Sequence, residues 1–134
     1  MARVKRAIYS ASILLSVILG TLVAAQPASA ASWTWYNAAG GRPVSMGLFH
    51  TGKHVAKASV ELLNTSSPIT LTVRFRGRHA NGTPTGPWKS YTWNCAHSGC
   101  AHTWNINFTY VAGNTVSGSA VVSGVIEGVA THRF

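Results

Sequence analysis

Residues 69–76 read Ile-Thr-Leu-Thr-Val-Arg-Phe-Arg, and this stretch decides the fold class. Large apolar side chains occupy every second position, and threonine or arginine occupies the positions between them. Successive side chains of a β-strand point to opposite faces, so the alternation predicts a strand with one buried and one solvated face. From Ala31 onward no window carries apolar residues at sustained helical spacing. We therefore expect an all-β protein.

The same two-residue period returns in two further stretches, 88–95 and 103–110. In the first of them, Tyr91, Trp93 and Cys95 share one side of the strand. In the second, the side chains predicted to point inward are Trp104, Ile106, Phe108 and Tyr110. Weaker strands are predicted at 32–37, 44–50, 55–63, 115–122 and 125–132, separated by segments rich in Gly, Pro, Asn and Ser. Seven or eight short strands in about a hundred residues predict a small antiparallel β-sandwich or barrel.

The first thirty residues have a different composition from the rest of the chain. Arg3, Lys5 and Arg6 precede an uncharged run, which ends at Ala28-Ser29-Ala30. A basic start, an apolar middle and small residues at a cleavage site are typical of a secretory signal peptide. We predict a signal peptide over 1–30, cleavage near Ala30, and one secreted domain over 31–134. An uncleaved anchor is the alternative, because about 17 to 25 apolar residues can cross a bilayer.

The predicted domain is basic and has few carboxylates. The whole chain carries eleven Lys and Arg against two acids, a formal net charge of +9. Three of the cations lie in the predicted signal peptide, so the domain would carry +6. Its acids are Glu61 and Glu127, and it has no Asp. This excludes a Ser-His-Asp triad and leaves a glycosidase only if both glutamates face one cleft.

Two cysteines, Cys95 and Cys100, enclose only four residues. In an exported protein such a pair predicts a disulfide. We expect it to close a hairpin between the strands at 88–95 and 103–110, contributing about 2 kcal/mol for so short a loop. A zinc site is the alternative, but it would need two further ligands.

Arginine dominates one face of the first strand. If this strand continues beyond residue 76, then Arg74, Arg76 and Arg78 project from the same face at steps of ~7 Å, and Lys89 follows the next turn. Arginine pairs with phosphate and carboxylate in a bidentate manner, so the row predicts an anion-binding surface. The alternative is a solvated face that discourages edge-to-edge aggregation.

Three tryptophans are candidates for partly exposed rings. Trp33 and Trp35 share a face if 32–37 is a strand, and Trp88 lies where a loop enters a strand. Exposed indole rings stack on sugars or bases or lie at a membrane interface, and core packing is the alternative. We expect Trp93 and Trp104 to lie in the core.

Enzyme and metal hypotheses have less support from the residues. A ribonuclease-like site would use Glu61, His79, Arg74 and Arg76, but these residue types lie in no nuclease motif that we identify. His50 and His54 have a spacing that suits zinc on a helix, whereas Gly52 and the strand pattern oppose a helix there. We predict no catalytic residue, no metal and no cofactor.

Part of the N-terminal half resembles a known family. Trp33-Thr34-Trp35-Tyr36, the Gly40-Gly41 turn, Phe49-His50 and the stretch 53–60 are similar to the lactococcin-type secreted bacteriocins. The resemblance covers less than a third of the predicted domain. It implies a small cationic β-protein that acts on the cell-wall machinery of sensitive bacteria.

These patterns together favour a secreted binding protein, and the resemblance implies antimicrobial, bacteriocin-like action. We expect its partner to be an anionic envelope polymer or a lipid surface, bound through Arg74, Arg76, Arg78 and Lys89 with help from Trp33, Trp35 and Trp88. Free nucleic acid is a less favoured partner, and we expect a monomer. The alternatives are a small nuclease and a secreted inhibitor or carbohydrate-binding module.

Overall fold

The computed structural model describes residues 30–64, 68–96 and 100–134. Contacts divide the chain into two units, 1–30 and 31–134. The predicted signal peptide, except for Ala30, lies outside the described residues. Within the described residues, no helix is long and apolar enough to cross a membrane.

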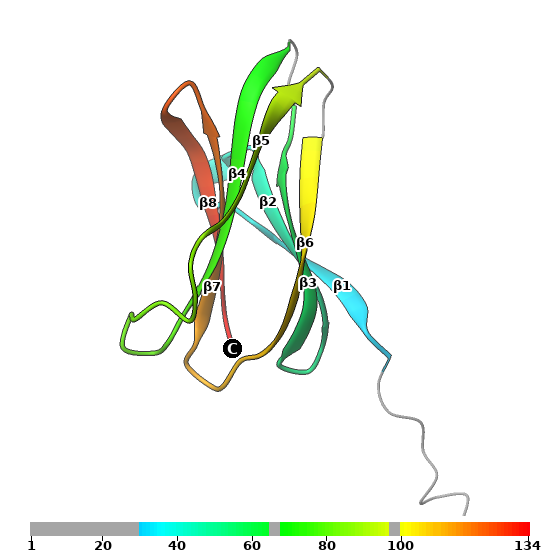
Figure 1. Cartoon of the computed structure of the whole chain (residues 1–134), viewed down its shortest axis with the longest axis vertical. Helices are drawn as coiled ribbons and strands as arrows, with labels where there is room; N and C mark the ends of the chain where they lie inside the picture. Colours follow the sequence, from blue (N-terminus) through cyan, green and yellow to red (C-terminus); the bar gives the residue numbers. More distant parts are fainter. Residues whose placement is uncertain (1–29, 65–67, 97–99) are drawn as a thin grey trace, which may run out of the picture. The chain divides into compact units, whose positions relative to one another are not determined.

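Unit 31–134 is a sandwich of two antiparallel sheets, each with four strands (Figure 1). The strands are β1 (Ser32–Asn37), β2 (Val44–Thr51), β3 (His54–Leu62), β4 (Ile69–Arg78), β5 (Lys89–Cys95), β6 (Cys100–Thr109), β7 (Thr115–Val122) and β8 (Val125–Arg133). A short 3-10 turn, η1 (Ala39–Gly41), joins β1 to β2. Sheet A has the order β1-β2-β3-β6, and sheet B has the order β5-β4-β7-β8. The predicted all-β antiparallel fold is confirmed.

The core lies between the two sheets, where the apolar positions of the alternating strands meet. Leu71 and Val73 of β4 are fully buried, as are Met46 of β2 and Val60 of β3. The sheets approach closely at Gly118 of β7, where a Cβ atom would lie 2.7 Å from Cγ2 of Val60. The alternation in 69–76 therefore fixes which face of β4 is buried, and it sends the arginines outward.

The predicted hairpin between β5 and β6 is wrong, although the disulfide between Cys95 and Cys100 is present. β5 pairs with β4, from Ile69 opposite Cys95 onward, whereas β6 pairs with β3 of the other sheet. The bond therefore joins sheet B to sheet A at one end of the sandwich, with 6.2 Å between the two Cα atoms. Two alternating strands beside each other in sequence favour a hairpin, but both strands here find other partners. Residues 97–99 lie outside the described residues.

β5 and β6 are edge strands of opposite sheets, and they diverge from the disulfide (Figure 1). The inner face of β6 is consequently covered only in part. Trp104 and Ile106 are half-buried and pack against the core, Phe108 is 36% exposed, and Tyr110 just beyond β6 is buried. The inward direction predicted for these side chains is right, but the edge position leaves part of their surface open.

Candidate binding faces and cavity

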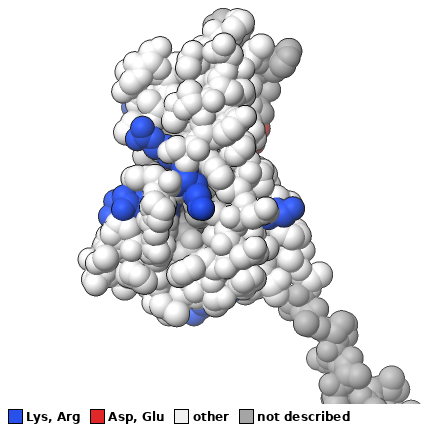
Figure 2. Space-filling view, viewed as in Figure 1, with Lys and Arg blue, Asp and Glu red and all other residues white. Residues whose placement is uncertain are grey.

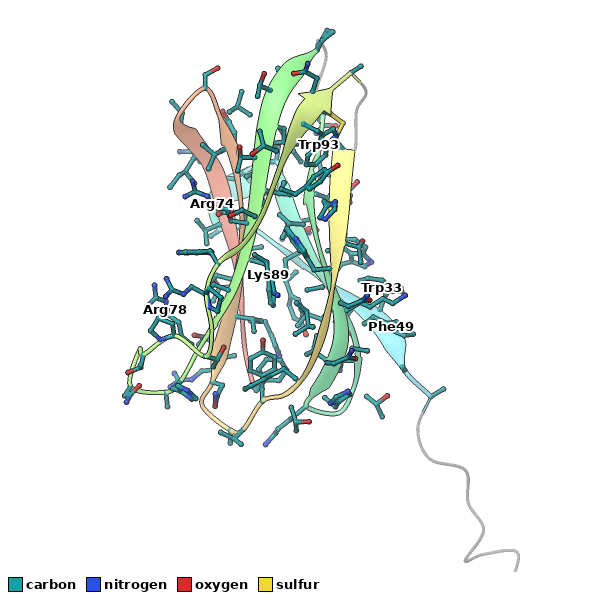
Figure 3. The ribbon with its side chains drawn as sticks, viewed as in Figure 1. Trp33, Phe49, Arg74, Arg78, Lys89 and Trp93 are labelled. Carbon is teal, nitrogen blue, oxygen red and sulfur yellow. A yellow bond between two sulfur atoms is a disulfide. The ribbon has the colours of Figure 1, made fainter. Side chains whose placement is uncertain are left out.

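The outer face of sheet B carries the three arginines that the sequence singled out. Because Val73 and Phe75 point into the core, Arg74, Arg76 and Arg78 point outward from β4. Arg74 and Arg78 are exposed, and Arg76 is half-buried. Figure 3 shows Arg74 and Arg78 directed away from the sandwich on the side of sheet B. The predicted continuation of this strand to residue 78 is what aligns the three side chains.

A fourth arginine, which the sequence reasoning missed, joins this row through strand pairing. Thr115 of β7 lies opposite Arg78 on one side and opposite Arg133 of β8 on the other. Directly opposed residues of antiparallel strands point to the same face, so Arg133 lies on the outer face of sheet B. Only the register of β7 with both neighbours reveals this placement. We call Arg74, Arg76, Arg78 and Arg133 the basic face.

Hydroxyl groups surround these arginines. Arg74 is flanked in the register by Ser90 of β5 and Ser119 of β7. Farther along the same face, Thr72 and Thr92 share a hydrogen bond of 2.8 Å. Within the described part of the chain, neither glutamate forms an ion pair with an arginine. Figure 2 shows Lys and Arg side chains across one view of the surface, with hardly any acidic atoms among them.

Two of the arginines are held in place by neighbouring groups. The guanidinium carbon of Arg76 lies 5.2 Å from the ring centroid of Trp88, within the range of a cation–π interaction. Arg78 donates a hydrogen bond of 2.9 Å from Nη1 to the carbonyl oxygen of Gly82. The Nε atom of Arg76 is buried and has no hydrogen-bond partner. Trp88 thus belongs with the arginines, as the sequence hypothesis required, and its ring is 42% exposed.

Lys89 does not share the basic face. It lies opposite the buried Phe75 in the register of β4 and β5, so its side chain projects toward the inner side of the sheet. Figure 3 shows Lys89 between the two sheets rather than beside Arg74 and Arg78. There it lines a cavity of about 190 Å³ at the open edge of the sandwich.

The outer face of sheet A carries the other two candidate tryptophans. Trp33 and Trp35 are 41% and 47% exposed, and their rings lie 5.7 Å apart at an angle of 19°. Phe49 of β2 lies 5.4 Å from the ring of Trp33. The ring of Trp35 covers Gly47, where a Cβ atom would come within 2.9 Å of it. We call Trp33, Trp35 and Phe49 the aromatic face.

The structure therefore separates residues that the sequence hypothesis grouped together. Trp33 and Phe49 lie on the sheet A side in Figure 3, whereas Arg74 and Arg78 lie on the sheet B side. Trp93 and Trp104, expected in the core, are half-buried and pack against it.

The residues of the nuclease hypothesis are also divided between the sheets. Glu61 lies between the inward-facing Val60 and Leu62 on β3, so it points outward from sheet A. Arg74 and Arg76 point outward from sheet B. His50 donates a hydrogen bond from Nδ1 to the carbonyl oxygen of Gly52, and its Nε2 shares a hydrogen bond with Oγ1 of Thr34. Among the described residues, no group of three His, Cys, Asp or Glu side chains could hold a metal ion.

Comparisons with known proteins give only distant likeness, and only in structure. No protein-family model matches the chain, and no curated protein matches it. One similar solved structure is an endonuclease/exonuclease/phosphatase from Beutenbergia cavernae DSM 12333, with 14% sequence identity and a TM-score of 0.47. The match covers 77% of this chain and 27% of that one, so this chain spans about a quarter of that protein's length.

Proposed function

We propose that this protein is a secreted cationic β-protein that binds an anionic component of a cell envelope through its basic face. The observation that carries the proposal is the row of Arg74, Arg76 and Arg78 on β4, extended sideways by Arg133. Solvated surfaces usually mix both signs of charge, but these four cations have no paired carboxylate among the described residues. Secretion rests on the predicted signal peptide.

The chemistry of the basic face suits a repeating anion. Neighbouring arginines on a strand are ~7 Å apart, and each guanidinium can form two parallel hydrogen bonds to a phosphate or carboxylate. The surrounding serine and threonine hydroxyls add donors that bind anions without adding charge. The stacking of Arg76 on Trp88 limits the entropy that this side chain loses on binding. A wall polymer or lipid surface with closely spaced anions presents partners for several arginines at once.

The test is a triple variant, Arg74→Gln, Arg76→Gln and Arg78→Gln, assayed by co-sedimentation. The probes are vesicles containing phosphatidylglycerol and a soluble poly(glycerol phosphate). We expect the triple variant to lose binding to at least one of these probes, with a stability change no larger than surface substitutions usually cause, about 0.5 kcal/mol each.

The matched control removes the same charge elsewhere. Arg42, Lys53 and Lys57 are exposed and lie outside the basic face. Changing all three to Gln lowers the net charge by the same amount and should leave most of the binding. Equal losses in both triple variants would show that only net charge matters, and the proposed site would be abandoned.

A second candidate function, carbohydrate binding, is favoured by the aromatic face. Two nearly parallel indole rings with exposed surface form a platform on which sugar rings stack. Lys57 lies opposite Phe49 and Asn105 opposite Lys57, so polar groups flank the rings on the same face. Binding to insoluble peptidoglycan that has been stripped of anionic polymers would test it. The paired change Trp33→Ala and Trp35→Ala should abolish that binding, whereas the arginine triple variant should retain it.

A further inference from the structure

The cavity at the open edge of the sandwich is separate from both outer faces. It forms because the pairing of β5 with β4 stops at Phe75 and Lys89, so the last part of β4 lacks a neighbour from β5. The chain returns across this edge, and the amide of Thr85 donates to the carbonyl of Gly77. The opposite wall is the inner face of β6. The opening thus lies between edge strands of two different sheets.

The walls of the cavity are mostly apolar. Phe75, Ile106, Phe108 and Tyr110 line it, together with Pro87. Burial raises the pKa of Tyr110 to about 12, although a hydrogen bond with Thr85 acts in the opposite direction. The phenol therefore stays neutral at ordinary pH and adds no charge to the wall.

The lack of a side chain at Gly77 lets Thr85 and Tyr110 lie close to β4 at the base of the cavity. A Cβ atom on Gly77 would lie 2.6 Å from Oγ1 of Thr85 and 2.8 Å from the ring of Tyr110. Any other residue at this position would push the returning segment or the tyrosine away.

A positively charged side chain lies beside this apolar cavity. Lys89 lines the cavity and is exposed at its opening, and it has no ion-pair partner among the described residues. Arg76 also borders the cavity, but its guanidinium group lies against Trp88 on the outer face of sheet B. An apolar wall beside an unpaired cation complements a molecule that is apolar at one end and anionic at the other.

We propose that this cavity binds a single-chain anionic amphiphile, with the alkyl chain against Ile106, Phe108 and Tyr110 and a carboxylate or phosphate head beside Lys89. At about 190 Å³ the cavity is smaller than the roughly 300–1,000 Å³ of sites for drug-sized ligands, so it holds part of one chain. This site is distinct from the basic face, and it assigns to Lys89 a role apart from the outward arginines.

The experiment is a calorimetric titration with alkyl phosphates below their micelle concentration. Hexyl, octyl and decyl phosphate should bind with affinities that rise about fourfold per added methylene until the cavity is filled, and then level off. Octyl phosphate should bind about tenfold more tightly than octyltrimethylammonium, because only the phosphate accepts charged hydrogen bonds from Lys89.

Two variants separate the head group from the chain. Lys89→Met keeps the length of the side chain and should remove the preference for phosphate over ammonium. Ile106→Gln should weaken binding of both amphiphiles, and its thermal unfolding midpoint must show that the domain remains folded. Lys57→Met, on the outer face of sheet A, is the matched control and should behave as the parent does.

The experiments distinguish a failure of the cavity proposal from a failure of the basic-face proposal. The triple arginine variant includes Arg76, so the double variant Arg74→Gln and Arg78→Gln is the informative one here, and its affinity for the alkyl phosphates should rise with chain length as it does in the parent. Equal affinity for the two head groups in the parent, or no dependence on chain length, would overturn the proposal. An equal loss of phosphate preference in Lys57→Met and Lys89→Met would overturn it as well.

Discussion

The two outer faces of the sandwich are built in the same way and carry different chemistry. On each sheet, strand alternation buries one set of side chains and exposes the next. The outer face of sheet B exposes arginines among serines and threonines, whereas the outer face of sheet A exposes Trp33 and Trp35 beside the half-buried Phe49. Four of the eight Lys and Arg residues in 31–134 therefore lie on one outer face, and the exposed indole rings lie on the other.

This separation predicts two kinds of interaction from one small domain. Attraction between a row of cations and an anionic polymer acts over a Debye length, about 10 Å at 0.1 M salt, and weakens as salt rises. Stacking on an indole ring requires contact and depends mainly on the apolar surface that is removed from water. The two faces should differ most clearly in their response to ionic strength.

The largest predicted effect is therefore a difference in salt dependence. By analogy with nucleic acid, where each neutralised phosphate contributes a slope of about −0.9 in log affinity against log salt, four arginines predict a loss of roughly 600-fold between 50 and 300 mM NaCl. Binding of stripped peptidoglycan by the aromatic face should change by less than about twofold. Fluorescence titration of both ligands over this range tests the comparison. A parallel decline in the two affinities would contradict the assignment of different chemistry to the two faces.

Much of the fold could be predicted because alternation is a local property. The strands at 32–37 and 115–122 were placed with their observed ends, and the predicted alternation of 69–76 matches the observed burial. Pairing between strands is not local. The sequence alone does not reveal that β5 and β6 belong to different sheets, so it predicts the disulfide in a hairpin.

Because strand pairing is not local, the sequence also leaves some residues of the candidate sites unpredicted. Arg74, Arg76 and Arg78 share a strand, so their alignment follows from the two-residue period alone. The placement of Arg133 beside Arg78 depends on two registers through Thr115. The closeness of Lys89 to the arginines in sequence predicts a shared face, but its position opposite Phe75 puts it on the other side of the sheet.

The second effect concerns the covalent link between the sheets. Replacing both cysteines, Cys95→Ser and Cys100→Ser, should lower the free energy of unfolding by about 2 kcal/mol, as expected for a loop of this length. The two outer faces are each built within one sheet, so both should keep their ligands. Urea denaturation followed by tryptophan fluorescence measures the loss, and the binding assays check the faces. Failure of the double variant to fold would mean that the bond supports far more than one end of the sandwich.

The third effect concerns a glycine on the aromatic face. Gly47→Ala would place a Cβ atom 2.9 Å from the ring of Trp35, so the ring must leave its position over β2. An indole forced away from a staggered rotamer costs about 1 kcal/mol, which corresponds to about a fivefold loss in affinity for stripped peptidoglycan. Binding of the anionic polymer should not change. If Gly47→Ala weakens the binding of both ligands equally, the two faces are coupled and do not act as separate binding surfaces.

The smallest predicted effect is a loss of stability at low pH. Each lateral edge of the sandwich carries a histidine stacked on a tyrosine of the other sheet. His132 of β8 lies 4.3 Å from Tyr36 of β1, and His102 of β6 lies 3.8 Å from Tyr91 of β5. Burial lowers the pKa of His102. Burial, and then the charge of His50, lowers the pKa of His132.

Both histidines therefore bind protons more readily in the unfolded chain than in the folded domain. The stability that follows from this is fully present above the unfolded pKa, about 6.5, and is lost as the pH falls toward the lowered folded values. We expect the thermal midpoint to fall between pH 7.5 and 5, and the paired change His102→Gln and His132→Gln to flatten that fall. At pH 8 both histidines are neutral in the folded and the unfolded state. The difference in thermal midpoint between the parent and the double variant at that pH therefore measures the contribution of the lost ring contacts. An equally steep decline in the double variant would show that other groups set the acid sensitivity, and that the two stacks at the sheet edges act through packing alone.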